Sequence, residues 1–363
     1  VQATDPLTGK AATYLEVLGC YAAGTRIAAD TGRKLVEDLR EGDAIVTLDG
    51  GQRRLRHVTW IGERRLDLST HPRAELAAPI RFRRGALAEG VPERDLLLSP
   101  DHGVFLDGKF VPAKLLVNDM TIVQERDAPS VHYFHFELDG HAVMLAEGME
   151  AESYLDSGNR GFFANGGEAV VLYPEFSIEA AQGDWTKRLC APLVRCAAEV
   201  EPIWRPLVER AVTLGYVRPD YVTTADPDLR LIADGRTIRP ISGRGGRLVF
   251  MVPPGVTSVR IGSRHASPAD LRPYADDWRR LGVAISRIIV RAEAGRTEIP
   301  ADHPSLGDGW HQPERHEAAV WRWTDGDALL PLPTDAGGLM LEVHVRASMV
   351  YRIGPVQDAR RVA

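Results

Sequence analysis

Short apolar runs separated by turn-forming residues fill the chain from residue 25 to residue 145. Within these runs apolar and polar side chains alternate, and a period of two indicates strands with one buried face. Two of the breaks, Asp49-Gly50-Gly51 and Asp107-Gly108, have the composition of tight hairpin turns. The expected strands are 26–28, 44–48, 58–61, 96–98, 103–106, 121–124, 132–138 and 142–145. This part of the chain is therefore expected to be all-β.

The pattern changes between residues 187 and 214, where apolar residues recur at helical spacing. They are Leu189, Leu193, Ala197, Val200, Ile203, Trp204, Leu207 and Val208. Pro202 and Pro206 lie within this stretch, and a proline inside a helix removes a hydrogen bond and clashes with the preceding turn. We therefore expect two short helices that together act as a connector.

Strand-like runs return after residue 221, at 229–233, 247–252, 258–261, 283–291, 319–323 and 339–346. Two packed sheets, as in a sandwich, are the simplest arrangement for them. The predicted organisation is a mainly β chain with an upstream segment at 1–19, an all-β domain at 20–155, a linker and helical connector at 156–220, and a β-sandwich-like domain at 221–363.

Composition fits two domains and excludes some partners. A chain of 363 residues with 44% hydrophobic residues can bury two cores. The net charge of −6, with both signs mixed, leaves no extended positive surface for nucleic acid. No apolar run reaches the about 18 residues of a membrane span. We expect a soluble protein, in the bacterial cytoplasm or secreted; because the first residue is Val1, any targeting signal is expected upstream in a longer precursor.

The three cysteines are too few and too irregularly spaced for a disulfide framework or a CxxC metal site. Cys190 and Cys196 are interpreted as small buried residues of one helical segment. His303, His311 and His316 also lack the spacing of a metal site. No metal and no cofactor are expected, and Cys20 is the cysteine to which we assign chemistry.

Three motifs in a fixed order resemble the Hint (Hedgehog/intein) domain family. The runs GCYAAGTRI at 19–27 and VEDLREGDAIV at 36–46 are similar to the opening of these domains, where a nucleophilic cysteine is followed by a Leu-x-x-Gly-Asp-x-Val turn. LLSPDHGVFL at 97–106, continued by FVPAKLL, resembles the family's Thr-x-x-His motif. YFHFEL at 133–138 looks like its late strand. The resemblance extends from Cys20 to about Ser153.

The resemblance implies a self-processing chemistry that elementary reactivity supports. Cys20 would attack the carbonyl of Gly19, and covalent adjacency gives such a reaction an effective molarity of about 10⁵ M or more. His102 would protonate the amide nitrogen that leaves. His135 would activate the thiol. Ser99 would orient His102 or contribute to an oxyanion site.

Other histidines remain as alternatives for the activating role. His132 is close to His135 in sequence and could serve in its place. His141 and His71 are also available. For Gly19, the lack of a side chain leaves the scissile carbonyl approachable and permits a strained backbone.

The family pattern fails at the end of the domain. Splicing inteins end in His-Asn before Cys, Ser or Thr, because the asparagine cyclises to release the downstream segment, whereas this chain has Glu152-Ser153. We therefore expect cleavage of the Gly19–Cys20 bond without splicing. The substrate is the chain's own upstream segment, and the thioester passes to water, the default acceptor, or to another nucleophile.

The most distinctive stretches of the C-terminal half are 307–314 and 321–328. Trp321 and Trp323 share one strand face, where they either fill the sandwich core or stack on a carbohydrate or another surface ligand. The rival to self-processing is a catalytically retired Hint scaffold that works as a binding or surface-display module through this domain.

Overall fold

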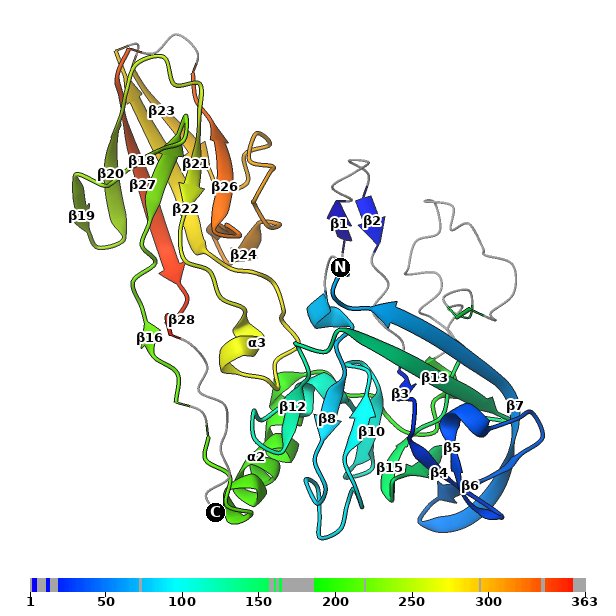
Figure 1. Cartoon of the computed structure of the whole chain (residues 1–363). Helices are drawn as coiled ribbons and strands as arrows, with labels where there is room; N and C mark the ends of the chain where they lie inside the picture. The colour runs from blue at the N-terminus through cyan, green and yellow to red at the C-terminus, as the bar shows by residue number, and fades with distance from the viewer. Residues whose placement is uncertain are drawn as a thin grey trace. The chain divides into compact units, whose positions relative to one another are not determined.

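The computed structural model describes residues 2–4, 11–13, 19–71, 74–156, 160, 163–164, 186–218, 220–293, 295–333 and 337–354. The chain divides into two compact units (Figure 1). The N-terminal unit contains residues up to 219 together with the segment Pro273–Asp276, and the C-terminal unit contains 220–272 and 277–357. Both are built mainly from strands, as the sequence predicts. Every helix within the described ranges is too short or too polar to cross a membrane.

One sheet of thirteen described strands forms most of the N-terminal unit. Its strands are β3 (Tyr21–Ala22), β4 (Arg26–Ala29), β5 (Gly32–Leu35), β6 (Ala44–Asp49), β7 (Gln52–Asp67), β8 (Ile80–Phe82), β9 (Leu96–Leu98), β10 (Gly103–Leu106), β11 (Lys109–Pro112), β12 (Ile122–Gln124), β13 (Ser130–Leu138), β14 (Val143–Ala146) and β15 (Met149–Glu152). Short 3₁₀ turns lie at η1 (Val36–Asp38), η2 (Ala74–Leu76), η3 (Ala113–Leu116) and η5 (Thr186–Arg188). A separate antiparallel pair joins β1 (Gln2–Thr4) to β2 (Ala11–Thr13).

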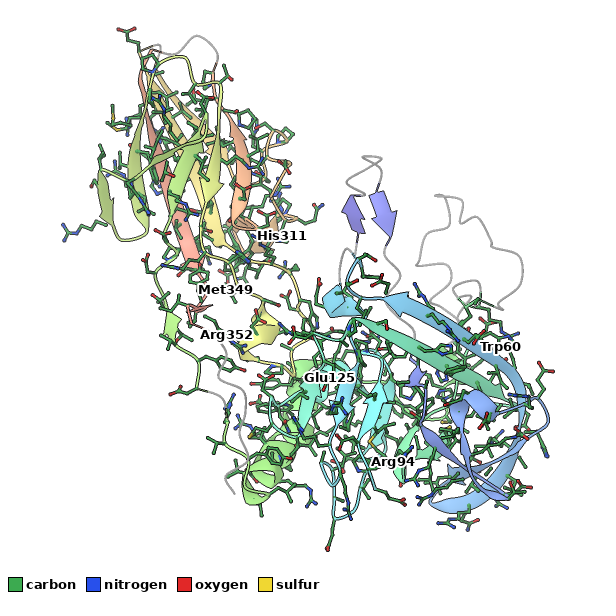
Figure 2. The ribbon with its side chains drawn as sticks, in the orientation of Figure 1. Trp60, Arg94, Glu125, His311, Met349 and Arg352 are labelled. Atoms are coloured by element: carbon green, nitrogen blue, oxygen red, sulfur yellow. The ribbon has the colours of Figure 1, made fainter. Side chains whose placement is uncertain are left out.

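The longest strand of this sheet exceeds its predicted length. We expected 58–61, whereas β7 runs over Gln52–Asp67 and lies alongside β13 in Figure 1. The added residues before position 58 are mostly polar and exposed. Backbone pairing with β6, and not burial of side chains, holds them in the strand. Figure 2 labels Trp60 on this strand. Burial patterns alone cannot reveal a strand of this kind.

Both predicted hairpin turns are confirmed. β6 and β7 are joined by Gly50 and Gly51, with φ of 55° and 81°, and β10 and β11 by Asp107 and Gly108, with φ of 49° and 77°. Positive φ at both central residues is the geometry of a type I′ turn, which matches the twist of the flanking strands.

The position of Cys20 is set by the short strand that follows it. β3 pairs with β13 through Phe134↔Tyr21 and with β9 through Tyr21↔Leu98. Tyr21 is fully buried between these neighbours. Cys20 therefore enters the sheet from an interior position, next to Ser99 at the end of β9 and to β13, which carries His135.

The helical connector contains a single helix, α2 (Ala197–Thr213), so the expectation of two helices was wrong. Pro202 and Pro206 are four residues apart on the exposed side, where water can satisfy the carbonyls that lack a proline N–H partner. The opposite side is buried, and Trp204 donates its Nε1–H to the carbonyl of Val117 at 2.7 Å. Packing of the buried side keeps the helix continuous.

The chain before α2 extends the sheet. The N–H of Phe110 donates to the carbonyl of Pro192 at 2.8 Å, and the N–H of Val194 donates to Phe110 at 2.9 Å. Cys190 and Cys196 are both exposed, so their interpretation as buried residues of one helix was wrong. Cys190 precedes this extended segment and Cys196 is the N-cap of α2, and neither position is turned into the core.

The C-terminal unit is a sandwich of two sheets, which confirms the predicted fold class. One sheet has the order β18 (Arg236–Ile238), β17 (Arg230–Ala233), β21 (Ser258–Gly262), β26 (Asp327–Pro331). The other has the order β19 (Ser242–Arg244), β20 (Arg247–Val252), β27 (Leu339–Ser348), β22 (Val283–Ala292), β25 (Ala319–Trp323), β24 (Glu314–His316), with β23 (Gly295–Pro300) beside β22. Both sheets contribute to one core, for example through Ile261 and Phe250. The unit also contains α3 (Pro268–Leu271) and the pair β16 (Thr223–Thr224) with β28 (Tyr351–Arg352).

The structure places neither Trp321 nor Trp323 in the buried core of this sandwich; both are half-buried. Trp310 is the tryptophan in the core. The Nε1–H of Trp321 donates to Glu314 at 2.9 Å, and the guanidinium carbon of Arg346 lies 4.5 Å from the centroid of the indole. His311, labelled in Figure 2, is 2.7 Å from the carbonyl oxygen of Arg280.

Candidate functional site

The peptide group between Gly19 and Cys20 is held by the loop that follows β9. The amide N–H of Cys20 donates to Oγ of Ser99 at 2.7 Å, and the N–H of Ser99 donates to the carbonyl of Cys20 at 2.9 Å. Cys20 itself is only 2% exposed. Ser99 therefore contacts the nitrogen that would leave if the Gly19–Cys20 bond were cut.

Gly19 occupies a space too small for a side chain. A Cβ at this position would lie 2.6 Å from Oε1 of Glu152 and 3.3 Å from both Cα and Nδ1 of His102. The first distance is shorter than real Cβ contacts. The main chain at Gly19 thus lies directly against His102 and Glu152.

His102 is fully buried beside the scissile bond. Its ring centroid is 4.2 Å from that of Tyr21, and burial lowers its pKa to about 4, although Glu152 opposes this shift. Neither ring nitrogen has a hydrogen-bond partner among the described residues. The motifs assign His102 to protonation of the Cys20 nitrogen, but the hydrogen bond found at this nitrogen is the one to Ser99. The imidazole is neutral at pH 7 and is free to accept a proton.

His135 joins the same site from β13. Its ring is 2% exposed and its centroid lies 5.3 Å from that of His102. The N–H of Phe136 donates to Nδ1 at 3.1 Å, which leaves Nε2 as the protonated nitrogen of the neutral ring. Burial lowers the pKa of His135 well below its ordinary value, and His102 adds to the shift.

The alternative histidines have different surroundings. His132 is next to Glu63, with Nε2 and Oε2 3.2 Å apart, and packs on Phe134. His71 is half-buried in the loop that leads from β7 to η2. His141 differs from these two histidines, because its ring faces the carboxylate of Glu152.

Glu152 is a site residue that the sequence motifs did not assign. Its Oε1 accepts the N–H of Gly103 at 2.6 Å, and its carbonyl accepts the hydroxyl of Tyr21 at 2.7 Å. Burial alone would raise the pKa of its carboxyl, but His141, His102 and the Gly103 N–H more than offset this and hold the pKa below its ordinary value. The carboxylate is therefore ionised at neutral pH.

His141 is the partner of this carboxylate. Its Nε2 lies 3.7 Å from Oε2 of Glu152. Burial alone would lower the pKa of His141, but the interactions with Cys190 and Glu152 raise it to about 9. In the neutral ring Nδ1 accepts the backbone N–H of Cys190 at 3.2 Å. His141 connects Glu152 to the segment that precedes α2.

The Cys20 thiol is protonated in this environment. Burial raises its pKa well above the ordinary value; Arg64 opposes the shift, and the charge of Glu152 adds to it. Any reaction of Cys20 as a thiolate would therefore need a base at the site. The neutral rings of His102 and His135 and the carboxylate of Glu152 are basic groups described there.

His102, His135 and Glu152 present one ligand atom each within 4.8 Å of one another. Two imidazoles and a carboxylate at this spacing are compatible with a small cation such as Zn²⁺. The same spacing also suits proton transfer around Gly19.

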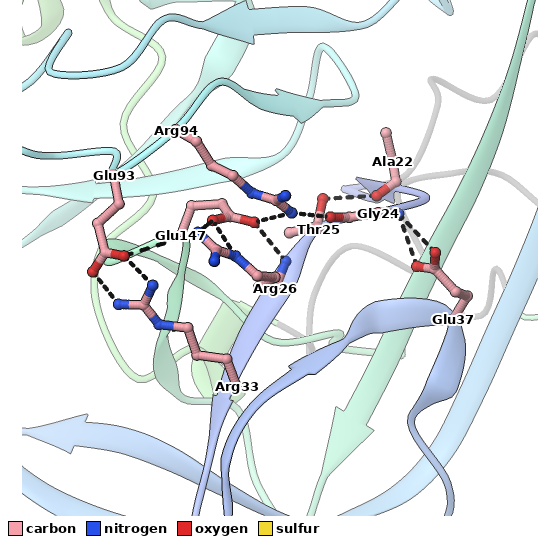
Figure 3. A network of polar contacts seen from close by, with 9 residues as sticks. All are labelled: Ala22, Gly24, Thr25, Arg26, Arg33, Glu37, Glu93, Arg94 and Glu147. Atoms are coloured by element: carbon pink, nitrogen blue, oxygen red, sulfur yellow. Dashed lines mark hydrogen bonds and ion pairs between the residues drawn. The ribbon is translucent and has the colours of Figure 1, made fainter.

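A polar network fixes the turn that carries the chain from β3 to β4 (Figure 3). The Glu147 side chain, 1% exposed, accepts the N–H of Arg26 at 2.7 Å and pairs with the guanidinium groups of Arg26 and Arg94, both at 2.8 Å. The N–H of Gly24 donates to the carboxylate of Glu37 at 2.8 Å and 3.0 Å. These contacts anchor the segment that follows Cys20 and β3.

Comparison with known proteins supports the assignment made from the motifs. The model of the Hint domain family matches residues 19–158. The chain resembles the solution structure of a bacterial intein-like domain from Clostridium thermocellum, with 20% identity, a TM-score of 0.28, and coverage of 37% of this chain and 97% of that one.

The chain also resembles two DnaB inteins. For an Ssp DnaB mini-intein variant the identity is 9% and the TM-score 0.29, over 39% of this chain and 99% of that one. For a DnaB intein from Synechocystis sp. PCC 6803 the identity is 11% and the TM-score 0.28, over 38% and 99%. No curated protein matches. By its match to the family model, the part of the chain at 19–158 is assigned to a Hint domain.

Proposed function

We propose that the chain cleaves its own backbone between Gly19 and Cys20 and does not splice. The observation that carries this proposal is the hydrogen bond from the Cys20 amide to Ser99, made where the main chain of Gly19 lies against His102. The nucleophile, the leaving nitrogen and a proton carrier are thus in one buried site.

In the first step Sγ of Cys20 attacks the carbonyl carbon of Gly19. The C–S bond forms, the C–N bond breaks, and the thiol proton is transferred to the departing nitrogen. Because both site histidines are neutral at pH 7, this proton comes from the thiol itself. His135 assists its removal, and His102 delivers it, with Ser99 already in contact with the nitrogen.

In the second step the thioester is transferred to water or to another nucleophile, which breaks the C–S bond and frees the upstream segment. Release at the other end of the domain is not proposed. Ser153 has no amide with which to cyclise, and its buried hydroxyl oxygen accepts the N–H of Ala142 at 3.0 Å. The reaction stops after N-terminal cleavage.

The test is to incubate the purified chain with and without hydroxylamine, which cleaves thioesters, and to follow by mass the peptide that ends at Gly19. We expect release that hydroxylamine accelerates, and none from Cys20→Ala. Cys196→Ala is the matched control, because this exposed thiol is outside the site. No release under any condition would contradict the proposal and favour the retired scaffold.

A further inference from the structure

The carboxylate of Glu152 is enclosed by two glycines. A Cβ on Gly103 would lie 2.8 Å from both Cδ and Oε2 of Glu152, and a Cβ on Gly19 would lie 2.6 Å from Oε1. Because both positions are glycine, no side chain competes for the space that the Glu152 carboxylate occupies. The carboxylate is thereby brought against Gly19, whose carbonyl carbon becomes the acyl carbon of the thioester.

Three contacts fix the orientation of this group. Oε1 accepts the N–H of Gly103 at 2.6 Å, the main-chain carbonyl of Glu152 accepts the Tyr21 hydroxyl at 2.7 Å, and Oε2 faces Nε2 of His141 at 3.7 Å. A carboxylate held from several sides is preorganised, which is what a base needs. The contacts also leave it ionised at neutral pH.

The charge of Glu152 does not help the first step. A negative charge beside the thiol disfavours the thiolate, and Glu152 indeed contributes to the raised pKa of Cys20. A group that opposes formation of the nucleophile yet is held against Gly19, the residue that becomes the acyl group, has a different use. That use is in the step in which the thioester is resolved.

Building on the proposed self-cleavage, we propose that Glu152 is the general base that activates the water which hydrolyses the Gly19–Cys20 thioester. One proton of the water passes to the Glu152 carboxylate while its oxygen bonds to the Gly19 carbon. The C–S bond then breaks, and the proton passes to the departing sulfur of Cys20. The products are a carboxyl group at Gly19 and the free thiol of Cys20.

The experiment separates thioester formation from thioester hydrolysis. It compares variants of Glu152 and offers either water or hydroxylamine as the acceptor. Glu152→Gln keeps the size of the side chain and an oxygen for the Gly103 N–H but removes the base. We expect spontaneous hydrolysis to fall by roughly 10²-fold or more, while release by hydroxylamine, which needs no base, remains at the wild-type level or above. Glu152→Asp, which retains a carboxylate, should hydrolyse faster than Glu152→Gln.

Glu150→Gln is the matched control, because Glu150 lies on the same strand two residues away. In ¹⁸O-labelled water, the peptide released from the wild type should gain one heavy oxygen at the Gly19 carboxyl. If Glu152→Gln hydrolyses at the wild-type rate while hydroxylamine still releases the peptide, the role of Glu152 is refuted and self-cleavage stands. An equal loss of spontaneous hydrolysis and of hydroxylamine-dependent release also overturns the role of Glu152, because Glu152 would then act in the first step or in folding. No release from the wild type itself refutes self-cleavage.

Discussion

The amide N–H of Cys20 donates a hydrogen bond of 2.7 Å to the hydroxyl oxygen of Ser99. This places a hydroxyl at the nitrogen that must be protonated before the peptide bond can break. Both residues are buried, so water does not readily replace this contact. The contact predicts that Ser99 acts on the leaving group and not only on the orientation of His102.

Replacing Ser99 with alanine should therefore slow thioester formation. Loss of one hydrogen bond to a buried group corresponds to about 1.4 kcal/mol, or roughly tenfold in rate. Ser99→Thr keeps the hydroxyl and should retain most activity. The measurement is the hydroxylamine-dependent release of the peptide that ends at Gly19, and equal rates for Ser99→Ala and Ser99→Thr would contradict this role.

A second prediction concerns the size of residue 19. Gly19→Ala introduces a Cβ into the space held by Oε1 of Glu152, at a distance of 2.6 Å. We expect slower cleavage, because either the carboxylate or the scissile carbonyl must move. Combining Gly19→Ala with Glu152→Ala should relieve the clash, so hydroxylamine-dependent release should be faster than in Gly19→Ala alone. Additive losses in the double variant would show that the clash is not the cause.

The sequence predicted most strands and the identity of the residues that meet at Cys20. Apolar alternation located β10 and β13, and the motifs pointed to Ser99, His102 and His135, which the fold brings together. These signals are local, because the motifs place Ser99 and His102 at strand ends and His135 within a strand. They could be found without knowing how the strands pair.

Glu152 could not be found in this way. It reaches Gly103 because β10 pairs with β15 through Val104↔Ala151, a contact between strands far apart in the sequence. In the sequence, this position is notable only because Glu152-Ser153 stands where splicing inteins have His-Asn. The continuity of α2 was also hidden, because it depends on which side of the helix Pro202 and Pro206 face.

A third prediction concerns the network around Glu147. Glu147→Ala removes a buried carboxylate that satisfies the Arg26 amide and two guanidinium groups. Because both arginines are partly exposed, we expect a loss of about 1–3 kcal/mol in the free energy of unfolding rather than the larger penalty of a fully buried pair. Arg33→Ala removes a surface pair with Glu93 and should change stability by about 0.5 kcal/mol or less. Urea denaturation of both variants in a Cys20→Ala background measures the difference.

The buried histidines predict a stability maximum near pH 6.5 for the N-terminal unit. Burial lowers the pKa of His102 to about 4 and that of His135 in the same direction. Below pH 6.5 the unfolded chain therefore binds protons that the folded chain excludes, and stability falls as the pH drops towards 4. The pKa of His141 is raised to about 9, so its contribution is complete below pH 6.5 and is lost as the pH rises to 9.

Two variants separate the fall in stability at low pH, the acid limb, from the fall at high pH, the alkaline limb. His102→Gln should reduce the acid limb between pH 4 and 6.5 by about 3 kcal/mol and leave the part that belongs to His135. His141→Gln should flatten the alkaline limb and leave the acid limb in place. Amide hydrogen exchange in β13 reports on this unit alone, and a pH profile of the same shape in His102→Gln and wild type would rule out His102 as the titrating group.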